Sequence, residues 1–123
     1  MTLAKRPPIS GRRRVPRRTF EANVGVLLSG VYKVEQAHQV GEGGMMISCS
    51  EEVLNEGRNL AMSFFLPSGE LIMVRGIVRA VVPAKGKNGA RYGIEFLEVG
   101  FQYKRAIRNF VAAATRVDGQ IIS

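Results

Sequence analysis

Hydrophobic and polar residues alternate over most of residues 19–98, which is the pattern of β-strands with one buried face. The clearest stretch is residues 20–28, where apolar side chains occupy every second position. Weaker alternation, or a short apolar run, follows at residues 31–40, 45–47, 59–66, 71–82 and 91–97. The pattern therefore predicts six strands.

The two later strands allow specific predictions about which side chains point inward. One face of residues 71–82 carries apolar side chains at Ile72, Val74, Val78, Ala80 and Val82. The opposite face carries Arg75 and Arg79, which we expect to be solvated. In residues 91–97 we expect Tyr92, Ile94 and Phe96 to point inward.

Turn residues separate most of these segments. They are Ser29-Gly30, the glycines at 41, 43 and 44, Pro67-Ser68-Gly69, and residues 85–89 with Asn88-Gly89 as the strongest hairpin signal. Residues 50–58 are acidic and are expected to form a loop. Because short turns join antiparallel strands, the connections favour an antiparallel sheet.

Only the last segment has helical spacing. Apolar residues recur at intervals of three and four at Tyr103, Ala106, Ile107, Phe110, Val111 and Ala114. We expect a helix over residues 101–115 that packs through Ile107, Phe110 and Val111. Six short strands and one amphipathic helix predict a mainly β fold, a small six-stranded antiparallel barrel with the C-terminal helix plugging or flanking it.

Positive charge is concentrated before the first strand. The formal net charge is +8, and residues 1–20 contribute Lys5, Arg6, Arg12, Arg13, Arg14, Arg17 and Arg18 without any acidic residue. Residues 1–18 show no periodicity and include Pro7, Pro8 and Pro16, so we expect a flexible basic arm, with residues 19–115 as the folded domain and 116–123 as a tail. Such an arm is suited to nucleic acid, to an anionic membrane surface or to a small phosphate-bearing ligand.

Several function classes lack support in the sequence. Cys49 is the single cysteine, so an internal disulfide and a CxxC site are excluded, and a reducing, cytoplasmic location is expected. No apolar run is long enough for membrane insertion. His38 is the single histidine, without metal-ligand spacing around it, and no nucleophile stands near it in the local pattern, so we expect neither a metal cofactor nor an enzyme.

Three landmarks together resemble the PilZ domain family, the bacterial receptors of cyclic di-GMP. An arginine cluster precedes the first strand, a glycine-rich turn separates the second and third, and YGIEF, residues 92–96, precedes the closing helix. The resemblance covers roughly residues 11–115. The first family motif, RxxxR, is matched by RRVPR with Arg13 and Arg17. The second, [D/N]xSxxG, corresponds to QVGEGG, where Gln39 and Gly41 depart from the motif and Gly44 matches it.

The resemblance implies a binding site for cyclic di-GMP. Its implied residues are Arg13 and Arg17, the neighbouring Arg12, Arg14 and Arg18, and Gln39, Gly41 and Gly44. An arginine fork can grip a phosphate or the O6/N7 edge of guanine, and glycines let a ligand approach the backbone. Gln39 offers one carbonyl oxygen in place of a carboxylate, and Gly41 has no hydroxyl. Each lost contact costs roughly 0.5–1.5 kcal/mol, up to about 3 for a charged partner.

Three functions follow from this reading. The first is a receptor or adaptor, a monomer or a ligand-linked dimer, that binds cyclic di-GMP and signals to a protein partner. The second is a degenerate PilZ adaptor that binds no nucleotide and acts by protein contacts. The third is a small-barrel nucleic-acid binder; it is disfavoured, and no specific nucleic acid is expected, because no strand face interleaves aromatic and basic residues.

Overall fold

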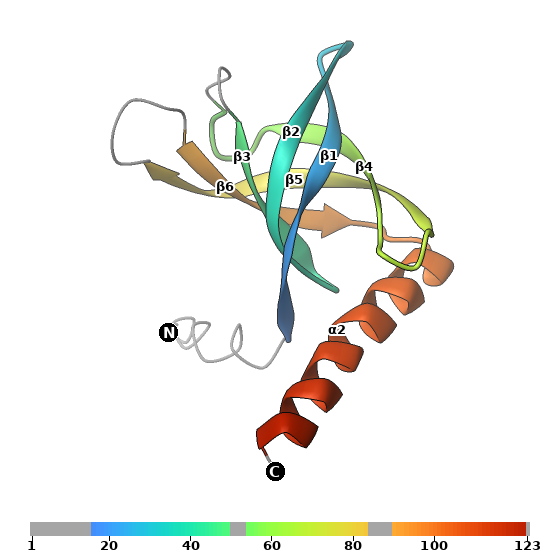
Figure 1. The fold of residues 1–123 in the computed structure, drawn as a ribbon. Helices are drawn as coiled ribbons and strands as arrows, with labels where there is room; N and C mark the ends of the chain where they lie inside the picture. Colours follow the sequence, from blue (N-terminus) through green and yellow to red (C-terminus); the bar gives the residue numbers. More distant parts are fainter. Residues whose placement is uncertain (1–15, 50–53, 84–89, 123) are drawn as a thin grey trace, which may run out of the picture.

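The strands of the chain close into a single antiparallel barrel. The computed structural model describes residues 16–49, 54–83 and 90–122, with the side chains of the last helix described as far as residue 113. The elements are β1 (Arg17–Leu28), β2 (Val31–Gly41), β3 (Gly44–Cys49), β4 (Asn59–Phe65), β5 (Leu71–Pro83), β6 (Ala90–Leu97) and α2 (Phe101–Ile122). The strands pair in the order β1-β2-β3-β6-β5-β4 and close on themselves (Figure 1). The predicted six-stranded antiparallel barrel with a C-terminal helix is confirmed.

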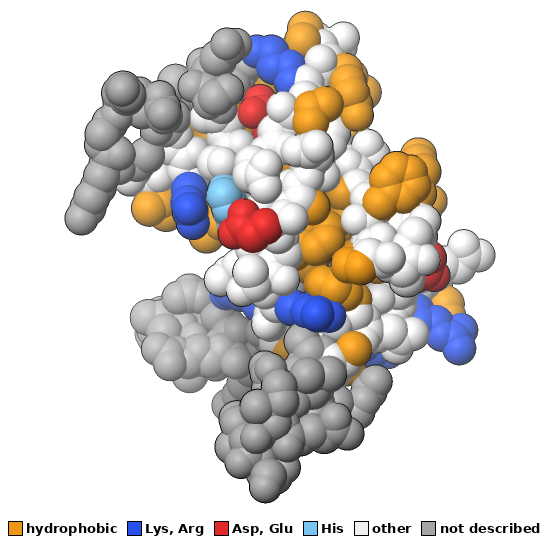
Figure 2. Space-filling model, in the orientation of Figure 1, with side chains coloured by type: hydrophobic (Ala, Val, Ile, Leu, Met, Phe, Trp, Pro, Cys, Tyr) orange, Lys and Arg blue, Asp and Glu red, His pale blue; other side chains and the backbone are white. Residues whose placement is uncertain are grey.

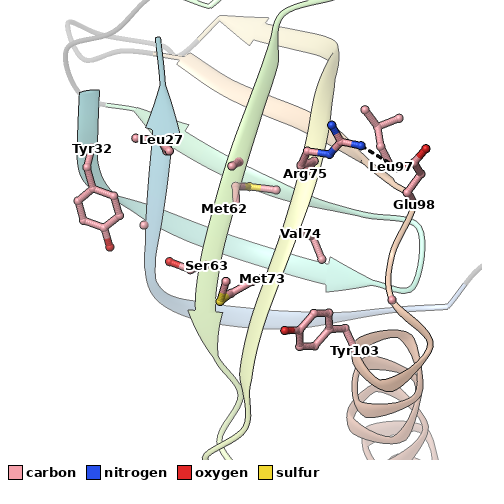
Figure 3. A pocket seen from close by; sticks show the side chains of 13 residues that line it. Leu27, Tyr32, Met62, Ser63, Met73, Val74, Arg75, Leu97, Glu98 and Tyr103 are labelled. Atoms are coloured by element: carbon pink, nitrogen blue, oxygen red, sulfur yellow. Dashed lines mark hydrogen bonds and ion pairs between the residues drawn. The ribbon is translucent and has the colours of Figure 1, made fainter. Parts of the chain in front are cut away.

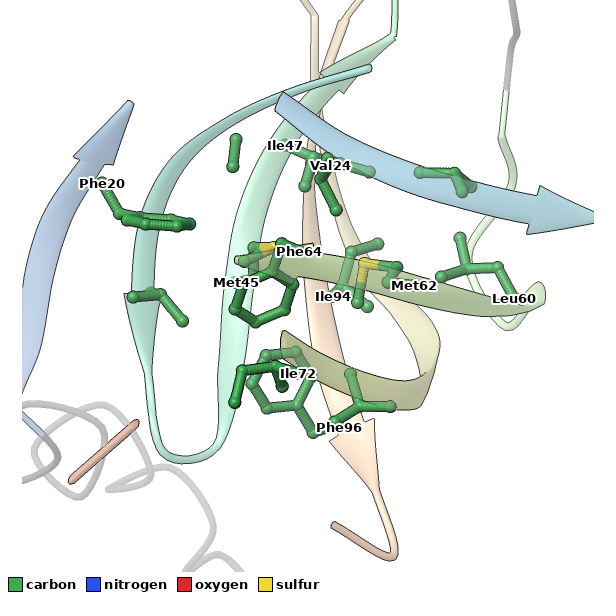
Figure 4. Packing of buried hydrophobic residues seen from close by; sticks show 14 of the residues in the cluster. Phe20, Val24, Met45, Ile47, Leu60, Met62, Phe64, Ile72, Ile94 and Phe96 are labelled. Carbon is green, nitrogen blue, oxygen red and sulfur yellow. The ribbon is translucent and has the colours of Figure 1, made fainter. Parts of the chain in front are cut away.

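Alternate side chains of every strand fill the barrel. Val24, Ile47 and Ile72 are fully buried, and side chains from all the strands meet in the interior (Figure 4). Tyr92, Ile94 and Phe96 point inward as predicted. The Tyr92 hydroxyl also accepts a hydrogen bond from the backbone N–H of Leu54, at 3.2 Å, which satisfies its polar atom inside the core.

Helix α2 packs against the end of the barrel where β1 begins (Figure 1). Ile107 and Val111 are buried, and the half-buried Phe110 ring packs edge-to-face on Phe20 with centroids 5.6 Å apart. The predicted packing residues of the helix are therefore confirmed. The helix begins at Phe101, the expected residue, but it runs to Ile122 rather than ending near residue 115.

Two predictions about strands β1 and β5 need correction. β1 begins at Arg17, so Arg17 and Arg18 belong to the barrel and not to the arm. On β5 the predicted alternation holds as far as Val78, but Ala80 and Val82 are exposed. The pairing of β5 with β6 shifts register between Val78 and Ala80, and this bulge turns the following residues away from the core.

Some predictions concern segments outside the described residues. These are the arm as far as residue 15, the Asn88-Gly89 turn and the side chain of Ala114. Within the described ranges, α2 lacks the combination of length and apolarity that a membrane-spanning helix requires. In the same ranges, no three His, Cys, Asp or Glu side chains gather as possible metal ligands.

Candidate ligand-binding site

The start of β1 and the end of β2 bring two of the sequence-predicted residues together. Arg17 pairs with Gly41 across these strands, and Thr19 pairs with Gln39. Arg17 and Gln39 are therefore diagonal neighbours on one face of the ladder. The Arg17 Nη1 atom lies 3.5 Å from the Gln39 Oε1 atom, a long hydrogen bond between exposed side chains. The two positions thus present one donor group and one carbonyl oxygen to the same outer surface.

The two predicted glycines of this region are surrounded by protein backbone. A Cβ atom at Gly41 would lie 2.7 Å from the carbonyl oxygen of Pro16, closer than such atoms can approach. A Cβ atom at Gly44 would overlap the carbonyl oxygen of Ile94 on the paired strand β6. Gly43, between them in the turn, faces open space. Gly41 and Gly44 therefore allow strands to approach each other, whatever further role they have toward a ligand.

Arg18 turns to the opposite face of β1 and contacts the helix. Its Nη1 atom donates to the backbone carbonyl of Phe110, at 2.9 Å in a part-buried setting. The guanidinium carbon lies 4.0 Å from the centroid of the Phe110 ring, in cation–π geometry. Arg17 and Arg18 thus differ in role, because the first faces the outer surface and the second holds α2 against the barrel.

A second ionic contact attaches the helix to the glycine-rich turn. Arg108 of α2 grips Glu42 through two bonds, Nε to Oε2 at 2.9 Å and Nη2 to Oε1 at 3.2 Å. The hydrogen bond and the negative charge of Glu42 raise the pKa of Arg108 above its usual value. This pairing neutralises the carboxylate that lies nearest in sequence to Gly41 and Gly44. Helix α2 is therefore bound both to the arginine-bearing strand and to the turn.

The PilZ domain family model matches residues 11–113, which include both the arginine cluster and the glycine-rich turn. The chain belongs to the PilZ family. No curated protein sequence matches it significantly.

Solved structures with the same fold include several PilZ proteins. This PilZ domain is similar to the Bacillus subtilis inhibitor of motility MotI/DgrA, with a TM-score of 0.74 and 15% identity over 85% of this chain and 51% of that one. It is similar to the PilZ domain of Escherichia coli YcgR with c-di-GMP, at TM-score 0.69 and 17% identity, over 90% of this chain and 97% of that one. It is also similar to the K. pneumonia MrkH–c-di-GMP complex, at TM-score 0.68 and 14% identity, over 91% of this chain and 56% of that one. The chain thus spans about half the length of MotI/DgrA.

The structure places only part of the predicted site of this PilZ domain. Arg17, Gln39, Gly41 and Gly44 lie at one end of the β1–β2–β3 ladders. Arg12, Arg13 and Arg14, by contrast, lie outside the described residues. The arginines of β5 are exposed, as predicted, and pair with Glu95 and Glu98 at 2.5 and 2.6 Å.

His38 is not solitary in the folded PilZ domain, contrary to the prediction from its local pattern. Its Nδ1 atom lies 3.1 Å from the Glu21 carboxylate, and its Nε2 atom lies 2.9 Å from the Ser48 hydroxyl. These partners come from β1 and β3, and register shifts in both neighbouring ladders turn the three side chains together. Because its two partners come from different strands, we interpret the Glu21–His38–Ser48 row as a polar link that joins β1, β2 and β3.

Replacing Arg18 with alanine should loosen the helix of this PilZ domain. The change removes a part-buried, charge-assisted hydrogen bond and the contact with the Phe110 ring, so we expect a loss of about 1.5–3 kcal/mol in the free energy of unfolding. Urea unfolding measures this loss. The exposed Arg75 is the control, because breaking its surface ion pair should cost at most about 1 kcal/mol. Equal losses in the two variants would contradict the role assigned to Arg18.

Proposed function

We propose that this PilZ domain is a cyclic di-GMP receptor that acts in the cytoplasm and passes the signal to a protein partner. The observation that carries the proposal is the position of Arg17 beside Gln39. These residues are 22 positions apart in the sequence, occupy positions of different family motifs, and share one exposed surface. Two neighbours in fold are described with bound c-di-GMP, namely the YcgR domain and MrkH. The family membership supports the same ligand for this chain.

The proposed binding chemistry rests on the basic residues. Cyclic di-GMP carries two anionic phosphodiesters and two guanines. Arg13 and Arg17, four residues apart, would donate to a phosphate or to the O6/N7 edge of a guanine. Gln39 would accept from a guanine N–H through its carbonyl oxygen. Arg12 and Arg14 would add to the positive potential around the ligand.

The proposed signal passes through helix α2. Arg18 follows Arg17 directly and binds the carbonyl of Phe110 on the helix. A ligand that draws Arg17 and the preceding arm toward itself displaces the start of β1, and therefore changes the contact between Arg18 and α2. The surface that α2 and the arm present to a partner then differs between the free and the bound states.

One observation favours a second candidate, a PilZ adaptor that binds no nucleotide. Gln39 and Gly41 both depart from the family motif, and the loss of two contacts weakens binding roughly ten- to a thousandfold. The Pro16 carbonyl lies so close to Gly41 that a serine at position 41 would need the backbone to move. The backbone around Gly41 therefore does not fit the serine of the family motif, which also favours an adaptor without a nucleotide. An adaptor of this kind would act through protein contacts alone.

A calorimetric titration of the full chain with cyclic di-GMP tests the proposal. Saturable heat with this nucleotide, and none with GTP or single-stranded DNA, supports the receptor. Absence of heat with all three supports the adaptor. Binding to DNA of any sequence that falls steeply as salt rises would support a nucleic-acid binder instead, because counterion release dominates such binding.

Restoring the acidic residue of the second motif should tighten binding. In Gln39→Asp a carboxylate replaces a neutral amide, and we expect cyclic di-GMP affinity to rise about three- to tenfold, since bonds to charged groups are stronger. Isothermal titration calorimetry measures the change. The single variant is preferable to the double variant with Gly41→Ser, because the added Cβ would lie 2.7 Å from the Pro16 carbonyl oxygen. Unchanged binding in Gln39→Asp would show that position 39 does not contact the ligand, and weaker binding would show that a carboxylate there does not accept from a guanine.

A further inference from the structure

The outer face of the barrel carries an apolar hollow away from the candidate ligand-binding site. It has a volume of about 470 Å³ and lies over β1, β4 and β5, next to the start of α2 (Figure 3). Three small residues from neighbouring strands, Gly25, Ala61 and Ser63, lie among those that line it. Tyr32, Met73 and Tyr103 also line it, and the Tyr32 hydroxyl lies over Gly25, so that Tyr32 covers this part of the floor (Figure 3).

Large apolar side chains on this face are exposed to solvent. Tyr32 is 60% exposed, Phe65 63% and Met73 54%. Leu27, Val34 and Leu71 are further exposed members of the same face, and the strand register places each of them beside the hollow or beside Phe65. Hydrophobic side chains gather on the side of the molecule where β1 and β4 lie (Figure 2). A contiguous apolar patch of this kind marks an interaction surface, whereas single exposed apolar residues do not.

The charges that line the hollow indicate which kind of partner this face can bind. Arg75 and Glu98 are the ionised residues that line the hollow, and they pair with each other at 2.6 Å. The hollow therefore offers no net charge, although the whole chain carries +8. A nucleic acid, an anionic membrane or an acidic peptide would find in this hollow only a cation that Glu98 already neutralises. An apolar and uncharged partner surface matches this face best.

We propose that the partner on this face is a second copy of the chain. An interface between two identical chains related by a two-fold axis uses the same patch on both, so the patch has to carry both the protrusions and the hollow that receives them. This face does so, because the exposed Phe65 and Met73 lie beside the small Ser63 of the floor. Tyrosine, phenylalanine and methionine are also the residues enriched in the cores of protein interfaces.

The proposed dimer leaves the ligand-binding site free. Gly25 and Leu27 of the hollow lie toward the end of β1, whereas Arg17 begins the same strand. Association through this face therefore requires no cyclic di-GMP, in contrast to the ligand-linked dimer that the sequence suggested. The proposal of this dimer does not rest on the proposed receptor function.

Sedimentation velocity over a concentration series of the full chain, without nucleotide, tests the dimer. We expect the wild-type chain to change from one to two chains per particle as concentration rises. Met73→Glu places a charge at the rim, and Ser63→Arg fills the floor of the hollow. Each should raise the dimer dissociation constant at least about tenfold, as for the loss of a residue that dominates an interface. Circular dichroism confirms that the variants fold.

Val82→Glu is the matched control. Val82 is 48% exposed but lies beyond the β5 bulge, outside the residues of the hollow, so its dissociation constant should equal that of the wild type. A wild type that stays a single chain, or pairs only when cyclic di-GMP is added, overturns the proposal. A dimer that survives both Met73→Glu and Ser63→Arg overturns it too, as does one that Val82→Glu weakens equally. Capture of a different protein by this face of a monomeric wild type would assign the patch to that partner instead.

Discussion

Alanine at position 17 is expected to weaken cyclic di-GMP binding by roughly ten- to over a hundredfold, as is typical for the loss of charge-assisted hydrogen bonds of about 1.5–3 kcal/mol. The Arg17 side chain is exposed, and its described contact is the 3.5 Å bond to Gln39. The substitution should therefore leave the fold almost unchanged. Isothermal titration calorimetry gives the affinity. We expect a loss of the same size for Arg13→Ala, from its place in the first motif.

The control for these variants is Arg75→Ala. Arg75 is also an exposed arginine, but it pairs with Glu98 and lines the hollow on the outer face. Its loss should change cyclic di-GMP affinity by less than about threefold, because it has no direct contact with the proposed site. If Arg75→Ala weakens binding as much as Arg17→Ala does, the nucleotide is held by general positive charge and the proposed site is wrong.

A methyl group at position 44 is expected to destabilise the fold strongly. In Gly44→Ala the new Cβ would overlap the carbonyl oxygen of Ile94, where β3 pairs with β6. Because the obstructing atom belongs to the backbone of the closed barrel, the two strands have to separate. We expect a loss of about 1–3 kcal/mol or more in the free energy of unfolding, as for other forms of overpacking. Urea unfolding followed by circular dichroism measures this.

Gly43→Ala is the comparison within the same turn. A Cβ atom there meets nothing within 4 Å, so the change should cost at most about 0.5 kcal/mol. Two variants of equal stability would show that β3 and β6 can separate at position 44 with little loss of free energy. If Gly44→Ala then lost cyclic di-GMP binding while keeping its stability, a glycine would be needed at position 44 to make room for the ligand. It would not be needed for the close pairing of β3 with β6.

The strands were predictable because their signal is local. Alternating apolar residues such as Tyr92, Ile94 and Phe96 have to point to one side of a strand, whatever its neighbours are. Ala80 and Val82 continue the same alternation on β5 but are exposed. The bulge that turns them outward depends on how β5 pairs with β6, and residue spacing within one strand carries no information about that pairing.

In the candidate site, too, some features were predictable from the sequence and others depend on contacts between strands. Arg17 and Gln39 were predicted from motif positions, and the β1–β2 ladder brings them together. The contact of Arg18 with Phe110 joins residues 92 positions apart and could not be read from the arginine run. The partners of His38 were missed for the same reason, since they come from other strands. In each case a contact made by the closed barrel decides the role of a residue that looked unremarkable, or simply basic, in the sequence.

The attachment of α2 gives the helix mechanical leverage. It is held at Phe110 by Arg18, yet it continues to Ile122. Twelve further residues at about 1.5 Å each carry its axis some 18 Å beyond that grip. A tilt of about 10° at Phe110 would therefore swing the far end by roughly 3 Å, while the atoms around Arg18 move far less. A small shift at the start of β1 therefore produces a displacement at Ile122 that is about the length of a hydrogen bond.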